Sequence, residues 1–528
     1  MNKILLLLLG IVLSLSYAFA QQTFNKQYYF DSFLAVGNSV HVTDSCYYFS
    51  GLIVDTLPPY DEGIIFGRLD LNGELQEADM ILDTNLTFQN WLTPLIYNAA
   101  ENAFISMGYG SDSIGNYNYW MKISPDGERL GTRFFRNAYY PLSPFTRVND
   151  FLFHKSSNEY FVLNESNIGE NDIGLTPGYN TSITKLNALG DSIDRFTYEF
   201  SWNHLPVSML LQDDKIIVGI EESNHNITSF DRKARSRIIS VDTNFQMQWA
   251  WTSPNNTQQG ANDIIAEDDG SLIVASARGF LEDVNAGTRI MLWDRGLVFK
   301  LDENQEIAWE TELEWGGRNF TNRLTRMVRA TGSDGYVVAG TVAHPYHPGP
   351  GGRLGYLAKV STTGDSLWAR RLLYYELPDS IEYEHHIHDL QATPDGGYFM
   401  SGYTLDRVGA QAPPRQRAWF IKVDSEGCLI PGCGLVDTQA PTEQGPAVLL
   451  YPNPAAEHLN VYLGDSGGQQ WHFLLFDAAG RQMGSYAAPT PHTTYMLPVR
   501  DYPAGTYYIQ VVNEQGRGLK TYPWVKGD

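Results

Sequence analysis

The sequence is poor in basic side chains. Lys and Arg total 37 against 60 Asp and Glu, which gives a formal net charge of −23 at pH 7. A protein that binds nucleic acid needs a basic face to neutralise phosphates, and no stretch of this chain supplies one. The deficit therefore argues against a nucleic-acid partner. A net charge this negative mainly keeps an exported protein soluble.

Long apolar runs are missing after the N-terminus. The run at residues 4–19 ends in Ala18-Phe19-Ala20, a small-x-small sequence. It is short for a bilayer span of about 20 residues and carries two serines near its end. We therefore expect residues 1–20 to be a secretory signal peptide, and the remaining chain to be exported without a transmembrane segment.

Cysteine is scarce, and Cys46, Cys428 and Cys433 are the whole complement. In an oxidising, exported setting an odd count predicts one disulfide and one spare thiol. Cys428 and Cys433 enclose a short segment with Pro431-Gly432, and we expect these two cysteines to pair. Closure of a ring would bring the first and last repeats together, so a bridge from Cys46 to either of the others is the alternative.

Recognisable catalytic signatures are absent. The sequence has no G-x-S-x-G nucleophile elbow, no H-E-x-x-H zinc motif and no glycine-rich phosphate loop ahead of a helix. Paired carboxylates for glycoside hydrolysis can come from distant parts of a chain without a sequence signal. The absence of motifs therefore does not exclude an enzyme that acts on polysaccharide.

Glycine and aromatic residues are plentiful, with 48 Gly, 31 Tyr and 25 Phe, a balance that favours strands and turns. A three-residue pattern recurs along the chain: a polar or basic residue, then an aliphatic residue, then a small or acidic residue. A turn follows each triplet, and an apolar segment, often flanked by glycine, precedes each triplet. The seven copies, 54 to 63 residues apart, are Arg68-Leu69-Asp70, Lys122-Ile123-Ser124, Lys185-Leu186-Asn187, Ser240-Val241-Asp242, Lys300-Leu301-Asp302, Lys359-Val360-Ser361 and Lys422-Val423-Asp424. Each repeat therefore holds four short strands.

Four antiparallel strands in about 60 residues make one blade of a β-propeller. We predict an all-β chain in which residues 21–433 form a seven-bladed β-propeller. The region resembles the delta-60 or kelch-like repeat propellers of exported bacterial proteins, in particular in D-G-G-Y-x-x-x-G at residues 395–402 and K-V-D-x-x-G at residues 422–427. An open β-solenoid or a string of small sandwiches is the alternative.

The C-terminal part has a different pattern. Residues 434–447 are polar, rich in Pro and Gly and without periodicity, so we expect a linker. Residues 448–528 show short strands between turn signals. Their motifs Y-P-N-P-A, F-D-x-x-G-R and P-A-G-x-Y resemble the type A C-terminal sorting domain of the type IX secretion system. The motif residues are Tyr451, Pro452, Asn453, Pro454, Asp477, Gly480, Arg481, Gly505, Tyr507 and Lys526.

This resemblance implies an Ig-like sandwich of about seven strands that the type IX secretion machinery recognises. It further implies passage across the periplasm and the outer membrane, followed by removal of the domain or its attachment to surface lipopolysaccharide. We therefore expect a protein that is secreted or held at the outer-membrane surface. A small adhesive β-domain of another kind is the alternative.

The candidate ligand-binding residues fall on the first strands of the repeats. Asp389 and Asp263 each stand six residues before an acid of the following turn, and Asp150 opens the corresponding strand of the third repeat. Because such strands line the centre of a propeller, these acids with Asn149, Asn262 and His388 could ring one mouth and bind a cation or a sugar. His386 and His388 would share one face of their strand, where their imidazoles could hold a metal ion. The alternative is that Asn and Asp side chains cap loops there.

Taken together, these features predict a non-enzymatic exported protein that binds a glycan or protein ligand through a rim or channel mouth. The alternative is a hydrolase or lyase that acts on extracellular polysaccharide. No cofactor is expected, although a structural cation such as calcium would suit the acidic side chains. The sequence assigns no catalytic residue and no metal ligand.

Overall fold

The computed structural model describes residues 21–32, 34–56, 61–135, 147–170, 177–198, 203–223, 234–255, 258, 260–285, 288–314, 323–332, 334–343, 352–374, 382–407, 415–429, 448–451, 455–463, 471–477, 481–488, 493–513 and 518–527. These residues are all-β and contain no helix, which confirms the predicted fold class at this level. They accordingly include no helix that could cross a membrane. The predicted signal peptide and linker lie outside them.

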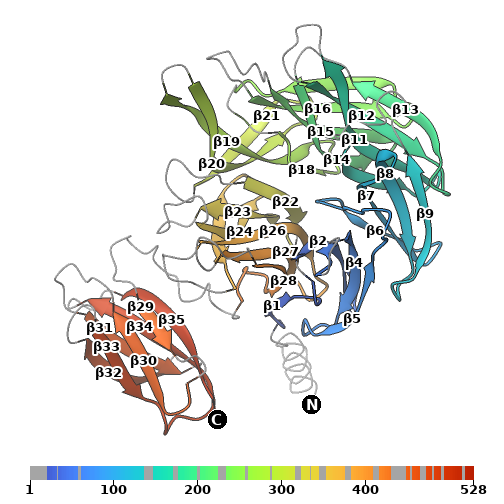
Figure 1. Ribbon diagram of the computed structural model, residues 1–528. Coiled ribbons are helices and arrows are strands. Elements are labelled where there is room, and N and C mark those ends of the chain that lie inside the picture. Colours follow the sequence, from blue (N-terminus) through green and yellow to red (C-terminus); the bar gives the residue numbers. More distant parts are fainter. Residues whose placement is uncertain are drawn as a thin grey trace, which may run out of the picture. The chain divides into compact units, whose positions relative to one another are not determined.

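The chain divides into two compact units, Met1–Pro431 and Gly432–Asp528. The first is a succession of four-stranded antiparallel meanders, in which each strand pairs with the next along the chain (Figure 1). The first three meanders are β2 (Leu34–Val42), β3 (Tyr47–Val54), β4 (Glu62–Leu69), β5 (Leu75–Ile81); β6 (Leu95–Asn98), β7 (Ala103–Asp112), β8 (Gly115–Ile123), β9 (Arg129–Phe135); and β10 (Arg147–His154), β11 (Glu159–Glu170), β12 (Pro177–Leu186), β13 (Ser192–Tyr198).

The meanders that follow are β14 (Asn203–Gln212), β15 (Lys215–Ser223), β16 (Ala234–Asp242), β17 (Met247–Thr252); β18 (Asp263–Ala266), β19 (Leu272–Asn285), β20 (Thr288–Leu301), β21 (Ile307–Glu314); β22 (Arg323–Arg329), β23 (Gly335–Ala343), β24 (Gly352–Ser361), β25 (Ser366–Leu372); and β26 (Glu382–Ala392), β27 (Tyr398–Arg407), β28 (Arg415–Val423).

The last meander takes its fourth strand from the N-terminal end of the unit. Strand β1 (Phe24–Tyr28) pairs antiparallel with β28, and Phe24 lies opposite Lys422. The indole Nε1 of Trp419 donates a hydrogen bond to Asn25 Oδ1 at 2.6 Å, and Asn25 Nδ2 donates to the carbonyl of Leu373 at 2.9 Å. The two ends of the repeat region therefore share one sheet.

Neighbouring meanders contact each other through their first strands. These contacts join β10 to β14, β14 to β18, β18 to β22 and β22 to β26, while β2 contacts both β26 and β6. Apolar side chains of the second and third strands fill the layers between meanders. Leu357 of β24, for example, shares a core cluster with Met400 of β27 and Ile421 of β28. The last meander thus lies beside the first.

The repeated triplet ends the third strand of each meander, and its last residue caps the turn that follows. Asp302 Oδ1 accepts hydrogen bonds from the backbone N–H groups of Asn304 and Glu306, both at 2.9 Å. Such side-chain caps stabilise tight turns, which is why Asp, Asn and Ser recur at this position. Equivalent caps are made by Asp70, Ser124, Asn187, Asp242, Ser361 and Asp424.

The lysine of the triplet pairs with an acid near the turn between the first and second strands of its own meander. Lys422, whose side chain is fully buried, lies 2.8 Å from Asp395. Lys359 lies 2.7 Å from Asp334 in the preceding meander. A buried ammonium needs such a partner, so the ion pair explains why a basic residue recurs.

The second unit consists of two antiparallel sheets. One has the order β29 (Val448–Tyr451), β30 (His458–Leu463), β33 (Thr493–Pro498), and the other β32 (Gln482–Ala488), β31 (Trp471–Asp477), β34 (Gly505–Asn513), β35 (Gly518–Lys526). Buried residues of both sheets, among them Val461, Phe473, Ile509 and Trp524, form one core. The unit therefore has a hydrophobic core of its own.

Candidate functional site

The three candidate aspartates occupy equivalent places on the first strands β10, β18 and β26. Each carboxylate joins two meanders, because one oxygen accepts from the next residue and the other from the first strand of the following meander. Asp389 Oδ1 accepts from the N–H of Leu390 and Oδ2 from the N–H of Val40, both at 2.9 Å. Asp150 accepts from Phe151 and Met209, both at 2.8 Å, and Asp263 from Ile264 at 2.9 Å and Met327 at 2.7 Å.

A β-bulge precedes two of these acids. The register of β26 against β27 shifts between Ile387 and Asp389, so His388 has no partner opposite it, and β10 shows the same shift before Asp150. A bulge turns the extra side chain away from its usual face. His388 Nδ1 thereby lies 3.1 Å from Asn38 Oδ1 of the neighbouring meander.

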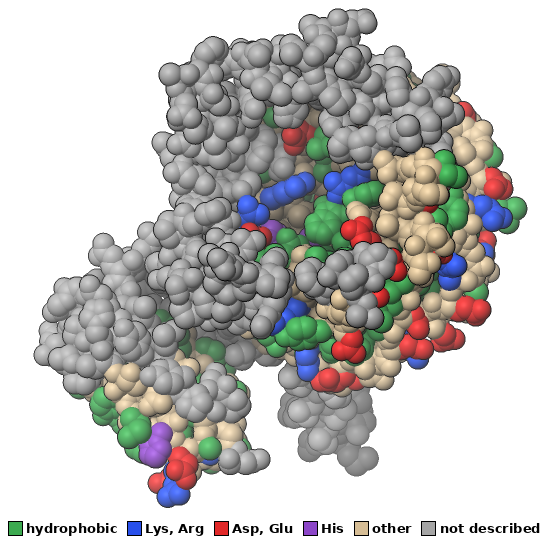
Figure 2. All heavy atoms as spheres, viewed as in Figure 1, with side chains coloured by type: hydrophobic (Ala, Val, Ile, Leu, Met, Phe, Trp, Pro, Cys, Tyr) green, Lys and Arg blue, Asp and Glu red, His purple; other side chains and the backbone are tan. Residues whose placement is uncertain are grey.

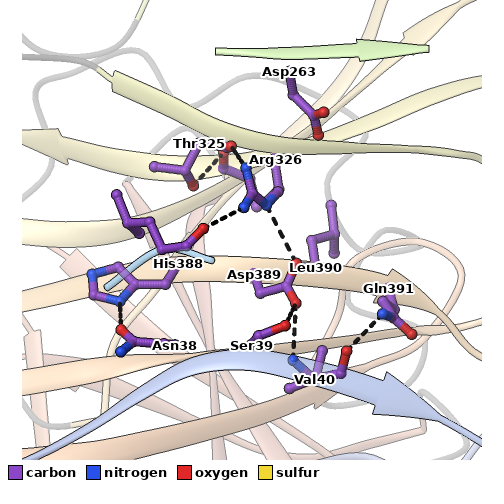
Figure 3. Close-up of polar contacts among 12 residues, drawn as sticks. Asn38, Ser39, Val40, Asp263, Thr325, Arg326, His388, Asp389, Leu390 and Gln391 are labelled. Atoms are coloured by element: carbon purple, nitrogen blue, oxygen red, sulfur yellow. Dashed lines mark hydrogen bonds and ion pairs between the residues drawn. The ribbon is translucent and has the colours of Figure 1, made fainter. Parts of the chain in front are cut away.

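Arg326 occupies the corresponding place in β22, directly after a bulge. Its Nε lies 3.5 Å from Asp389 Oδ1, and its Nη2 donates a hydrogen bond to the carbonyl of Leu92 at 2.8 Å. Figure 3 shows the guanidinium between Asp263 and Asp389, which come from different strands. The arginine therefore supplies a cation from within the chain to the acids at the centre of the unit.

The pKa values at the centre reflect this burial. Desolvation raises the pKa of Asp150 to about 7 and that of Asp263 to about 6, although the positive charge of Arg326 opposes both shifts. Burial alone would lower the pKa of Arg326, but the nearby carboxylates of Asp263, Asp389 and Asp150 outweigh it and raise the pKa. Burial lowers the pKa of His388 well below its usual value, so this imidazole is neutral at pH 7.

His386 has partners different from those of His388. Its Nε2 lies 2.6 Å from Glu384 Oε2, and its ring stacks on Tyr403 with 4.6 Å between centroids. Burial lowers the pKa of His386, while Glu384 opposes this shift. Among the described residues, no three His, Cys, Asp or Glu side chains are grouped so that they could hold a metal ion.

A pocket opens beside Arg326, with a volume of about 90 Å³. Residues of β10, β14 and β22 line it, together with Trp91 and Leu92 ahead of β6 and Asn262 ahead of β18. Figure 2 shows Lys or Arg side chains, in blue, in the hollow of this face, and the arginines in the lining are Arg147, Arg323 and Arg326. Of the residues predicted at the mouth, Asn149 and Asn262 line this pocket, whereas Asp150, Asp263, His386, His388 and Asp389 do not.

The sequence analysis missed these three arginines. The spacing of the repeats could have identified Arg326. It stands 63 residues after Asp263 and 63 residues before Asp389, so it occupies the same position in its repeat as these acids do in theirs. Arg147 and Arg323 each begin a first strand, β10 and β22. The prediction rested on acidic, amide and imidazole side chains, so it did not include basic residues at these positions.

The states of Cys46 and Cys428 agree with the predicted spare thiol and disulfide. Cys428 is disulfide-bonded, and Cys46 is a free, partly exposed thiol. The alternative in which Cys46 forms the bridge is therefore wrong. The expected partner Cys433 lies outside the described residues, so its pairing stays a prediction.

The predicted sorting motif is partly visible in the second unit. Asp477 and Arg481 bracket the turn between β31 and β32, where the backbone N–H and Nε of Arg481 donate to the two carboxylate oxygens of Asp477, both at 2.9 Å. The hydroxyl of the buried Tyr507 donates to the carbonyl of Pro503 at 2.9 Å, and its ring stacks on Trp524. These residues stabilise a hairpin and the core.

The other motif residues lie at strand ends. Gly505 pairs with Lys526 where β34 and β35 meet, and Tyr451 ends β29. Pro452, Asn453, Pro454 and Gly480 lie outside the described residues.

Comparison with protein families identifies this part of the chain. Residues 449–522 match the family described as the secretion system C-terminal sorting domain. The match shows that the chain carries the sorting domain of type IX secretion, which implies contact with that machinery and export to the cell surface or the medium. A search of curated proteins with the sequence found no match.

Solved structures resemble the chain only distantly. Drosophila Semaphorin 2a has 10% identity and a TM-score of 0.43, with 95% of this chain and 97% of that chain covered. The acylaminoacyl peptidase of Pyrococcus horikoshii has 11% identity and a TM-score of 0.39, with 82% of this chain covered. The present chain spans 59% of the length of that peptidase. These likenesses indicate no activity for this protein.

Proposed function

We propose that the protein is a non-enzymatic binding protein, delivered through the type IX secretion system, that takes a glycan or protein ligand at the pocket beside Arg326. The match of residues 449–522 to the sorting domain carries the export part of this proposal. Residues 1–20 would serve as a cleaved signal peptide that leads the chain into the periplasm. The mature protein would be released or held at the outer-membrane surface.

We propose further that residues 21–433 form a seven-bladed β-propeller and that the second unit is an Ig-like sandwich of the type A sorting class. Three observations support the propeller: the four-stranded meanders, the contacts between successive first strands, and the pairing of β1 with β28. The two sheets around one core support the sandwich. Such a ring would leave a central mouth where first strands meet, which is where the pocket lies.

Binding is favoured over catalysis because the central acids are already engaged. Asp389 accepts hydrogen bonds from Ser39 Oγ at 2.8 Å and from two backbone N–H groups, and it pairs with Arg326. A general acid or base must reach a proton of the substrate. A carboxylate whose two oxygens both accept hydrogen bonds from backbone N–H groups is better suited to joining the meanders than to proton transfer.

The test incubates the purified full chain with panels of polysaccharides and peptides, with and without calcium, and follows binding and product formation together. We expect saturable binding of at least one ligand without turnover. Cation-dependent cleavage of a polysaccharide that disappears in Asp389→Ala, while the variant still folds, would instead establish a hydrolase or lyase. An exposed Arg129→Gln variant on β9 serves as the matched control.

A further inference from the structure

Two guanidinium groups in the pocket make no direct ion pair with a described residue. Within the described residues, Arg147 and Arg323 form neither a hydrogen bond nor an ion pair through their side chains, and Arg147 contacts the ring of Tyr109 at 5.9 Å. Arg278, by contrast, pairs with Glu312 at 2.7 Å. In a chain with a net charge of −23, unpaired cations that share one pocket indicate an anionic ligand.

No described neighbouring side chain neutralises these two arginines by direct contact. Arg323 is exposed to solvent within the pocket, yet desolvation lowers its pKa; the charge of Glu221 opposes this shift, and nearby Arg147 lowers the pKa further. Glu165 interacts electrostatically with Arg147, and Glu221 with Arg323, while burial raises the pKa of both carboxyl groups. Neither carboxylate makes a direct ion pair with these arginines, and the two arginines repel each other, so an anion between them would be stabilised.

The donor groups of the other polar side chains in the lining are already used by the fold. Asn149 Nδ2 donates to the carbonyl of Pro206 at 2.5 Å, and Asn262 Nδ2 donates to that of Leu324 at 2.8 Å. Thr325 Oγ1 donates to the carbonyl of Ile387 at 2.9 Å. The buried Oδ1 of Asn149 has no hydrogen-bond partner and can accept from a ligand, but a ligand with several hydroxyls would need more partners than this one acceptor.

The rest of the lining is apolar and includes Trp91, Leu205 and Val207. Burying unsatisfied hydroxyls against such walls costs about 1–3 kcal/mol each, which disfavours a hydroxyl-rich sugar acid. A closed apolar cavity of about 150 Å³ binds benzene. The pocket, at about 90 Å³, is smaller, and this size suits a carboxylate with one small apolar side chain.

We propose that this pocket binds the C-terminal carboxylate of a peptide or protein chain whose last residue is small and apolar. Arg147 and Arg323 hold the carboxylate, whose planar geometry matches the guanidinium fork. The apolar wall contacts the last side chain, and the preceding residues leave through the open side. This inference rests on the proposed binding function and names its ligand class.

The experiment measures binding of fluorescein-Gly-Gly-Ala-Val to the full chain by fluorescence anisotropy, with the C-terminal amide of the same peptide as the matched probe. We expect saturable binding of the free acid, and binding at least tenfold weaker for the amide. Arg147→Gln and Arg323→Gln should each weaken binding of the acid about tenfold or more, the loss typical of a hydrogen bond to a charged group. Arg129→Gln should leave it unchanged.

Four results would overturn the inference. The acid and the amide bind equally, or neither binds at millimolar protein, or galacturonate competes as well as the unlabelled peptide, or sulfate does so at equal ionic strength. The first two comparisons use the unsubstituted chain and so do not depend on the folding of a variant. Thermal melts of the variants separate lost binding from lost structure.

The result also separates this inference from the proposed function. If the chain captures a glycan or protein from the panels and the Arg147→Gln and Arg323→Gln variants capture it equally, the binding function stands and the assignment of the pocket fails. If the chain cleaves a polysaccharide and binds no ligand without turnover, the proposed function itself fails.

Discussion

The second unit keeps its motif residues close together in the chain, whereas the first unit assembles its pocket from distant segments. Asp477 and Arg481 are four residues apart and meet in one hairpin. Arg147 and Arg323 stand 176 residues apart and reach one pocket only because successive meanders place their first strands side by side. Local motifs therefore identify the sorting domain, while the architecture creates the pocket.

This difference separates two tasks. The second unit matches the sorting-domain family over residues 449–522 and has its own core. The first unit is a repeated scaffold, and one repeat departs from others at a few positions, such as Arg326 where three other repeats carry Asp150, Asp263 and Asp389. Fold-level similarity says little about such positions.

The largest expected effect comes from removing the C-terminal sorting domain. A chain that ends at Gly434 should be absent from the surface and the medium of a type IX-competent host and accumulate in the periplasm, because it lacks residues 449–522. Immunoblots of each fraction measure this, with the full-length chain as control. Equal export of both chains would contradict the division of tasks.

Arg326→Leu tests the centre of the first unit. It leaves Asp150, Asp263 and Asp389 buried without their cation, so we expect the free energy of unfolding of this unit to fall by about 3–5 kcal/mol. Urea denaturation followed by tryptophan fluorescence measures the change. Arg129→Leu on the exposed face of β9 should change it by less than about 0.5 kcal/mol. A loss below about 1 kcal/mol for Arg326→Leu would show that the acids do not depend on this arginine.

Phe24→Ala tests the closing strand β1. The ring is 7% exposed and lies 6.0 Å from the ring of Tyr47 and 5.8 Å from that of Phe399. Its removal should lower the free energy of unfolding by about 3 kcal/mol. Leu189→Ala, at a side chain that is 63% exposed, is the control. Equal stability of the two variants would mean that β1 does not hold the last meander.

The raised carboxyl pKa values predict a pH dependence. Between about pH 4 and 7 folded Asp150 keeps a proton that the unfolded chain has released, so its contribution to stability is lost as the pH rises through about 7. Raising the pH from 5 to 8 should lower the free energy of unfolding by about 3 kcal/mol through this group. Asp150→Asn should reduce that slope, whereas Asp126→Asn, at an exposed side chain, should leave it as it is. An unchanged slope in Asp150→Asn would contradict the shift.

The smallest effect is expected at the free thiol. Cys46→Ser removes no disulfide, so the free energy of unfolding should change by less than about 0.5 kcal/mol and non-reducing electrophoresis should show no difference. Cys428→Ser, which removes a bonded cysteine, should change both. Loss of a crosslink in Cys46→Ser would instead indicate a disulfide between Cys46 and one of the other two cysteines.

The sequence predicts the parts of the fold that depend on local chemistry. The triplet marks the end of each third strand because its last residue caps a turn two to four residues away, as Asp302 does. The pairing of β1 with β28 leaves no such signal, because backbone hydrogen bonds between distant strands do not require particular side chains.

The same distinction applies to the site. Repeat spacing places Asp150, Asp263 and Asp389 in equivalent strands, but their partners are backbone N–H groups and one arginine, which no motif specifies. The orientation of His388 depends on a bulge that alternation of residues along a strand does not reveal. The prediction included Asn149 and Asn262 of the pocket but none of its arginines, because a mouth that binds a cation or a sugar requires no basic side chain.

The division of tasks is tested most directly by attaching residues 434–528 to an unrelated periplasmic reporter enzyme with its own signal peptide, in a type IX-competent host. The measurement is the fraction of reporter activity at the surface and in the medium. The account predicts that the reporter with these residues leaves the cell while the reporter alone stays in the periplasm. Retention of the fused reporter would show that the second unit is not a sufficient address and that export depends on the first unit as well.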